Sequence, residues 1–228
     1  ARLVLSSSNK IKNLHFPYGK GIQYPGYDGY LVVDEATNFF PIGTSVFEFG
    51  TNGDIQGKFD EDIKKRSENS DGLDIEKTAL IFVSSKIWNH RTSIQKKITC
   101  TAKLYNWKEI KIIDAQTLCM WVDNHPGVSV WLMETMNGSI HGVSTAEKFW
   151  NEKIGNTSPT LTYQFFINNR DEKKKKIEKW ISKNSRGFFF IKAESAIEAT
   201  FFLIAAMNSF DIDILHKVIL VSDSKTWD

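Results

Sequence analysis

The sequence predicts an α/β protein whose β-sheet is flanked by helices. The apolar run ALIFVS at residues 79–84 lacks polar alternation, which is typical of a central strand buried on both faces. Amphipathic helical patterns precede and follow this run, at residues 55–70 and 93–104. Strands and helices therefore alternate along the chain, and we expect them to form a mixed sheet.

Two strands are expected before the first of these helices. Residues 29–34 and 45–51 are rich in β-forming side chains, and Pro25, Gly26, Gly43 and Gly53 bound them. Both segments are therefore predicted to be strands of the same sheet.

The helix predicted at 55–70 has an apolar and a charged side. Phe59 and Ile63 stand four residues apart and should face the sheet. Asp62 and Arg66 have the spacing of an ion pair, which we place on the solvent-exposed side. The sequence DGLD at 71–74 predicts a turn.

A second strand and helix follow the central strand. The segment EIKIID at 109–114 is predicted to be a strand, and Asp114 can cap a helix that carries Leu118 and Trp121. Pro126 opens one more helix. We assign residues 1–142 to this first domain.

The remaining residues are expected to form a smaller unit. Residues 143–162 are rich in Gly, Ser, Thr and Asn and are predicted to be a linker. Residues 163–228 predict a charged helix at 163–182, a strand at 188–192, a helix at 195–207 and a strand at 217–222. This order predicts a small Rossmann-like βαβ module that connects to a longer chain. The run DEKKKK at 171–176 predicts a solvated helix face.

Composition narrows the class of protein. The net charge of +2 over 228 residues means that any basic surface must be local. Cys100 and Cys119 lie in predicted helices, which indicates buried thiols in a reducing compartment and neither a disulfide framework nor a zinc site. No run approaches the roughly 18 apolar residues of a membrane span. We expect a cytoplasmic protein without a membrane partner, cut from a longer polypeptide because it begins and ends abruptly.

Two acidic residues are the main candidates for chemistry. Glu48 lies in the strand SVFEFG, where a buried charge is costly unless it is paired or bound to a metal ion. Asp28 precedes the neighbouring predicted strand, so both carboxylates should lie near one edge of the sheet. Such oxygen ligands suit Mg²⁺ (or Mn²⁺), which can activate water for phosphodiester hydrolysis.

Basic residues near these acids complete the predicted site. Lys58, at the start of the following helix, is expected to position the attacking water. Lys64, Lys65 and Arg66 are expected to hold the phosphate backbone of DNA. Arg91 is also expected to contact DNA, because its loop, WNHR at 88–91, follows the central strand at its carboxyl end, where open α/β sheets bind ligands.

Each of these residues also has a structural interpretation. Asp28 precedes Gly29, a pair that is common in turns. Glu48 can form a buried ion pair with Lys58 or Arg66. The loop at 88–91 can be an ordinary polar loop with Trp88 folded back on the core. No histidine pair has ligand spacing and no phosphate-binding G-x-x-x-x-G-K-[ST] motif occurs, so neither a His-based metal site nor ATP binding is expected.

Several segments resemble a known family. These are FPYGKGIQYPGYDG (16–29), PIGTSVFEFGTN (41–52) and KFDEDIKKR (58–66), followed by ALIFVS (79–84), WKEIKIIDA (107–115) and FWNEK (149–153). They resemble the N-terminal region of bacterial multidomain proteins of the STAND NTPase type, along nearly the whole chain to Trp227. In those proteins this region is similar to restriction endonucleases of the PD-(D/E)XK superfamily.

The resemblance implies a restriction-endonuclease-like mixed sheet with Asp28 as the motif aspartate and Glu48 as the acidic residue of the E-x-K element. The chain departs from the motif at Gly50, where the lysine is expected, so Lys58 would supply the amine from another element. The implied activity is metal-dependent DNA hydrolysis in an antiphage defence protein. Its partners would be NTPase and sensor regions of the same polypeptide and further copies of the chain.

A second hypothesis belongs to another class. The same region can be a catalytically degenerate domain that binds nucleic acid or oligomerises within a signalling NTPase. Metal binding separates the two hypotheses, because only the nuclease needs a divalent ion.

Overall fold

The computed structural model describes residues 1–17, 26–89, 92–155, 157–183, 187–210, 214–223 and 225. Contacts divide the chain into two compact units, Ala1–His125 and Pro126–Asp228. The boundary therefore lies before the helix at Pro126, not near residue 142. Residues 143–162, expected to be a linker, contain a strand and a helix, and Ala146 and Trp150 of this helix are buried in the core of the second unit.

The first unit is built on a five-stranded sheet with the strand order β1-β2-β3-β4-β5. β1 (Ile11–His15), β2 (Gly29–Val33) and β3 (Gly43–Gly50) pair in antiparallel fashion, and β4 (Thr78–Ser84) and β5 (Glu109–Ile113) continue parallel to β3. The sheet is mixed, as predicted. β4 is an interior strand, and the side chains of its apolar run are almost all buried.

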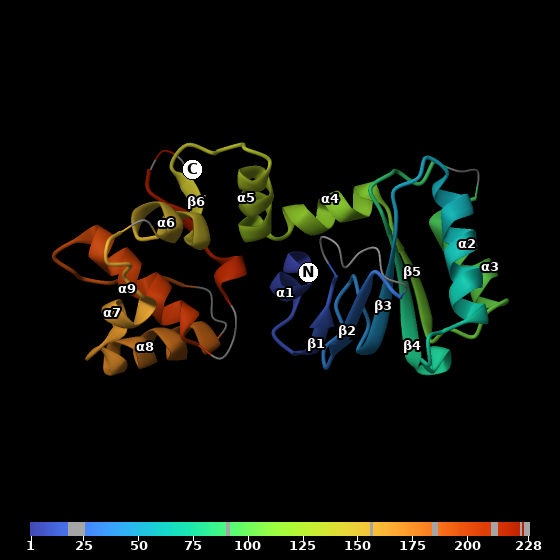
Figure 1. Cartoon of the computed structure of the whole chain (residues 1–228), viewed down its shortest axis with the longest axis horizontal. Coiled ribbons are helices and arrows are strands. Elements are labelled where there is room, and N and C mark those ends of the chain that lie inside the picture. The colour runs from blue at the N-terminus through green and yellow to red at the C-terminus, as the bar shows by residue number, and fades with distance from the viewer. Residues whose placement is uncertain are drawn as a thin grey trace. The chain divides into compact units, whose positions relative to one another are not determined.

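Helices cover both faces of this sheet (Figure 1). α2 (Ile55–Glu68) and α3 (Ile94–Ala102) pack on one face, and α1 (Arg2–Ser7) and α4 (Ala115–Asp123) pack on the other. A 3-10 helix, η2 (Ile75–Lys77), leads into β4. The α/β class with a sheet flanked by helices is confirmed, whereas α1 and β1 had no counterpart in the predicted elements.

α2 forms where the sequence predicts it. Asp54 caps its first turn by accepting a hydrogen bond from the backbone N–H of Gly57 at 2.9 Å. Phe59 is fully buried and meets Phe82 of β4 edge to face, with 5.4 Å between ring centroids. The predicted turn follows at residues 71–72, where Asp71 has a φ of 51°.

The second unit is mainly helical. Its helices are α5 (Pro126–Thr135), α6 (Ala146–Lys153), α7 (Tyr163–Ile167), α8 (Asp171–Ser182) and α9 (Ala196–Asn208), with the 3-10 helix η3 (Leu215–Lys217). β6 (Val143–Thr145) and β7 (Ile219–Val221) pair in antiparallel fashion. α9 lies in the centre of this unit, because much of its length is buried against α6, α7 and α8.

Three predictions for this part of the chain are wrong. The predicted helix at 163–182 is interrupted at Asn169, whose φ of 60° is left-handed. Residues 188–192 do not form a strand, and the described residues of this unit contain no βαβ module, because β7 takes β6 as its partner instead. A prediction for the first unit is also wrong, because Cys100 and Cys119 are both exposed and are not the buried thiols expected. No helix among the described residues has the length and apolar character that a membrane crossing needs.

Candidate functional site

Glu48 lies on the face of the sheet that α2 covers. Along β3, Val46 and Glu48 face α2, whereas Phe47 packs into the core beneath α1 and α4. Glu48 is only 6% exposed. The prediction that this carboxylate is buried is therefore confirmed, and its partners decide what it does.

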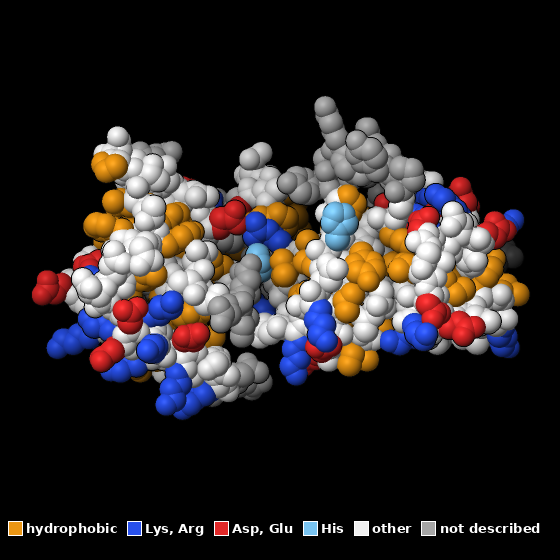
Figure 2. Space-filling view, turned by 60° about the horizontal axis from the view of Figure 1, so that its bottom comes forward, with side chains coloured by type: hydrophobic (Ala, Val, Ile, Leu, Met, Phe, Trp, Pro, Cys, Tyr) orange, Lys and Arg blue, Asp and Glu red, His pale blue; other side chains and the backbone are white. Residues whose placement is uncertain are grey.

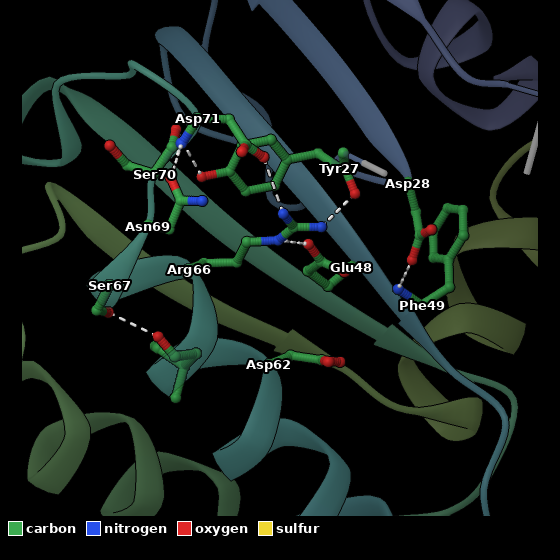
Figure 3. Close-up of polar contacts among 12 residues, drawn as sticks. Tyr27, Asp28, Glu48, Phe49, Asp62, Arg66, Ser67, Asn69, Ser70 and Asp71 are labelled. Carbon is green, nitrogen blue, oxygen red and sulfur yellow. Dashed lines mark hydrogen bonds and ion pairs between the residues drawn. The ribbon is translucent and has the colours of Figure 1, made fainter. Parts of the chain in front are cut away.

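The partner of Glu48 is Arg66 of α2. Its Nε donates a hydrogen bond to Glu48 Oε1, its Nη1 donates to Asp71 Oδ2 at 2.9 Å, and its Nη2 donates to the carbonyl oxygen of Gly26 (Figure 3). The guanidinium also lies over the ring of Tyr27, 4.3 Å from its centroid. The structural interpretation of Glu48 as a member of an ion pair is thus realised with Arg66, not with Lys58.

Arg66 was expected to hold the phosphate backbone, and its position does not suit that role. The residue is 5% exposed, and its guanidinium nitrogens already donate to Glu48, Asp71 and the carbonyl oxygen of Gly26. The expected exposed pair of Asp62 and Arg66 does not form, because both side chains lie on the buried side of α2.

Asp28 stands at the start of β2 and ties this strand to β3. Its Oδ2 accepts a hydrogen bond from the backbone N–H of Phe49 at 2.7 Å (Figure 3). Phe49 directly follows Glu48. The two acidic residues predicted from the sequence therefore lie at the same end of the neighbouring strands β2 and β3. Gly29 pairs with Phe47 in the register of the two strands, which places Asp28 there.

A third carboxylate, Asp62 of α2, was not among the predicted site residues. Its Oδ1 accepts a hydrogen bond from Lys58 Nζ at 2.5 Å, and its side chain is 5% exposed. Its Oδ2 is buried and has no hydrogen-bond partner among the residues that the structure describes. In Figure 3 the Asp62 carboxylate points away from Arg66. A buried carboxylate oxygen without a partner is costly, and a catalytic role or a bound water or ion is among the explanations for such an atom.

The surroundings of Gly50 on β3 leave no room for the lysine side chain that the resemblance implies at this position. A Cβ atom at Gly50 would lie 2.5 Å from Cζ of Phe82 and 3.3 Å from Cγ of Lys58. The ring of Phe82 therefore fills the space that a side chain at this position would need. The stem of Lys58 passes beside the same position, so the amine group reaches this edge of the sheet from α2.

Burial and mutual repulsion set the protonation of the acids. Burial raises the pKa of Glu48 to about 7; the charges of Asp28 and Asp62 add to the rise, and Arg66 opposes it. Burial likewise raises the pKa of Asp62, against the opposing effect of Lys58. Burial alone would lower the pKa of Lys58, yet the Asp62 carboxylate raises it, so this amine stays protonated at neutral pH. Perturbed acids of this sort are common at functional sites.

The oxygen donors suit a hard divalent cation. Mg²⁺ takes one or two protein carboxylates and keeps several waters, and Mn²⁺ accepts similar ligands. Asp28, Glu48 and Asp62 carry such oxygens, and Asp62 Oδ2 is buried without a hydrogen-bond partner among the described residues. No group of three or more His, Cys, Asp or Glu side chains is close enough to hold an ion by itself within the described part of the chain. An ion held here would take only one or two of these carboxylates and keep water as its other ligands.

The other predicted residues lie around this cluster in different ways. Lys64 and Lys65 are exposed on the outer side of α2. Arg91 lies outside the described residues. Trp88 is folded back on the core, where its ring lies 6.4 Å from that of Phe59 and its Nε1 donates to the carbonyl of Thr92 at 2.7 Å. The structural interpretation of Trp88 is therefore confirmed.

Comparison with known proteins adds no assignment. No protein-family model matches the chain, and no curated protein and no solved structure shows significant similarity to it. The function must be argued from the residues themselves.

Proposed function

We propose that the first unit is a nuclease-type domain that hydrolyses DNA phosphodiester bonds with Mg²⁺ or Mn²⁺. The observation that carries this proposal is Asp62, whose oxygen Oδ2 is buried and has no hydrogen-bond partner among the described residues, near Glu48, an acid whose pKa burial also raises. Replacing buried charges by apolar residues is often neutral or stabilising, so stability alone does not account for this cluster. The mixed sheet with helices on both faces belongs to the class that the restriction-endonuclease resemblance implies.

Each residue has a role in this proposal. One or two of the carboxylates of Asp28, Glu48 and Asp62 would hold the ion, which would supply Lewis-acid stabilisation of the phosphoryl oxygens and lower the pKa of water. Lys58, held protonated by Asp62, donates hydrogen bonds that position the attacking water or the phosphate. Lys64 and Lys65 contact the DNA backbone as exposed point charges.

Plasmid nicking tests the activity. The wild-type chain is incubated with supercoiled plasmid and Mg²⁺ or Mn²⁺, beside Glu48→Gln, Asp62→Asn and the control Glu76→Gln, which alters an exposed acid on η2. We expect both site variants to lose on the order of 100-fold in rate, because second-shell changes at metal sites already cost 10–100-fold. Equal nicking by the wild type and Glu48→Gln would show that the activity comes from elsewhere.

A degenerate or scaffold domain is the second candidate, and the Arg66 pair favours it. Arg66 already neutralises Glu48, as a purely structural ion pair would. Calorimetric titration with Mn²⁺ separates the candidates, and a crystal soaked in Mn²⁺ would locate the ion. Binding that is lost in Asp62→Asn supports the nuclease, whereas no binding to the folded wild type supports the scaffold. The wider assignment to an antiphage NTPase with sensor regions rests on the resemblance alone.

A further inference from the structure

The segment Phe188–Lys192 presents aromatic rings to solvent. Phe188 is 82% exposed and Phe190 is 89% exposed, and the two rings lie 6.1 Å apart with an interplanar angle of 30°. The intervening Phe189 is 37% exposed and contacts Trp180 of α8, 5.5 Å between ring centroids. Phe189 thus anchors the segment to α8, whereas the rings of Phe188 and Phe190 point to solvent.

Positive charge surrounds these rings. Lys173 and Lys176 of α8 and Lys192 line a cavity of about 170 Å³ together with Phe189 and Phe190. Figure 2 shows Lys and Arg side chains gathered over the α8 end of the second unit, with fewer acidic ones among them. None of these three lysines makes an ion pair with another residue in the described part of the chain. The lysine run that the sequence predicts to be a solvated face therefore borders an aromatic surface.

We propose that this aromatic and basic surface binds single-stranded nucleic acid. Proteins that bind single strands combine a positive groove for the phosphates with aromatic rings on which bases stack. A single strand leaves its base faces accessible, so Phe188 and Phe190 can stack on them. A duplex hides those faces and can engage only the lysines. The binding surface lies in the second unit and is separate from the proposed nuclease site.

An anionic membrane is a poorer fit to the same features. Membrane-surface binding by a helix requires a wide apolar face that enters the lipid. The apolar side of α8 is not available, because Ile177 is 2% exposed within the core beside α9. The exposed apolar surface consists instead of flat rings on an extended segment, which suits stacking.

Binding by the whole chain tests the aromatic part of the surface. Fluorescence anisotropy is measured with a labelled oligothymidylate of about 16 nucleotides and with a hairpin duplex, in EDTA so that cleavage cannot interfere. We expect the double variant Phe188→Ala/Phe190→Ala to bind the single strand at least about tenfold more weakly. The control Phe165→Ala, which removes another exposed ring on α7, should bind as the wild type does.

The lysines are tested through the dependence of binding on salt. Each phosphate contact to a single strand contributes about 0.7 to the slope of log affinity against log salt. The variant Lys173→Gln/Lys176→Gln should lower that slope by roughly 1.4, and the control pair Lys148→Gln/Lys153→Gln on α6 should not. Circular dichroism checks that each variant is folded, which is expected because the altered side chains are exposed.

Three results would overturn this proposal. Full single-strand affinity in the double phenylalanine variant would remove the stacking role, and so would binding of the hairpin by the wild type as tightly as the single strand. Phosphatidylserine vesicles bound in place of the oligonucleotide would assign the surface to membranes. Because every measurement excludes metal, these outcomes are independent of whether the first unit cleaves DNA.

Discussion

The two units carry charge in opposite ways. The first unit places Glu48, Asp62 and Arg66 inside the protein, each at most 6% exposed, between a five-stranded sheet and α2. The second unit keeps its charges at the surface and exposes aromatic rings there. A large sheet with helices on both faces supplies enough apolar burial to tolerate interior charge. The smaller unit, with strands of only three residues, buries none of its described charged side chains.

The largest expected contrast concerns phenylalanines. Phe59→Ala should lower the free energy of unfolding by about 3–5 kcal/mol, because it leaves a cavity between α2 and β4. Phe190→Ala should change it by less than about 0.5 kcal/mol, because the ring is exposed. Urea denaturation of each variant measures both values. A similar loss in the two variants would mean that the Phe190 ring is packed in the folded protein.

Arginine substitutions sharpen the comparison. Arg66→Ala should cost about 4 kcal/mol, because it leaves Glu48 and the Gly26 carbonyl without their donor. Arg170→Ala in the second unit breaks an ion pair with Glu198 whose side chains are 35% and 49% exposed, and it should cost less than about 1 kcal/mol. The two losses are compared through the midpoints of urea denaturation, provided that the unfolding free energy of both variants has the same dependence on urea concentration. A loss below about 1 kcal/mol for Arg66→Ala would contradict the buried cluster.

Glu48 predicts a pH dependence of stability. Its pKa is raised from 4.5 to about 7 on folding, so the folded state holds a proton that the unfolded state has lost in that range. The stabilisation is complete below pH 4.5 and disappears as the pH rises through 7, a change of up to about 3 kcal/mol. Measured against Glu48→Gln, the wild type should lose stability between pH 4.5 and 7. If the difference in unfolding free energy between the wild type and Glu48→Gln does not vary with pH, the raised pKa of Glu48 is ruled out.

Asp62→Asn is expected to have the smallest effect on folding. Asparagine keeps the oxygen that accepts from Lys58 and removes the buried charge, so stability should stay within about 1 kcal/mol of the wild type. Affinity for Mn²⁺ should nevertheless fall at least about tenfold if Asp62 is a ligand. Thermal unfolding and calorimetry on the same sample measure the two effects. Unchanged metal affinity would remove Asp62 from the proposed site.

Much of the first unit was predictable because its signals are local. The uninterrupted apolar run predicts β4, the 3.6-residue period of apolar side chains predicts α2, and Asp114 predicts the start of α4. The convergence of Asp28 and Glu48 followed from placing two neighbouring strands in one sheet. These inferences need only periodicity and adjacency.

The errors arose where a long-range partner decides the outcome. Residues 188–192 have strand composition, yet β7 pairs with β6, a segment of three residues that no local pattern marks. Asp62 and Arg66 were assigned to the solvent-exposed side of α2 because they are charged. Their spacing of three and seven residues from Phe59 places them on its side of the helix, and this was the signal that could have found them.

Gly50 of β3 and Phe82 of β4 share one space between two neighbouring strands, so only one of the two positions can carry a large side chain. Phe82 occupies the space that a side chain at position 50 would take, so a change at either position alters what the other can be. Gly50→Lys alone should clash, whereas Gly50→Lys with Phe82→Ala exchanges a ring on β4 for a chain on β3. The size of the residue at position 82 on β4 therefore limits which side chains position 50 on β3 can carry, and a lysine at position 50 requires both substitutions together.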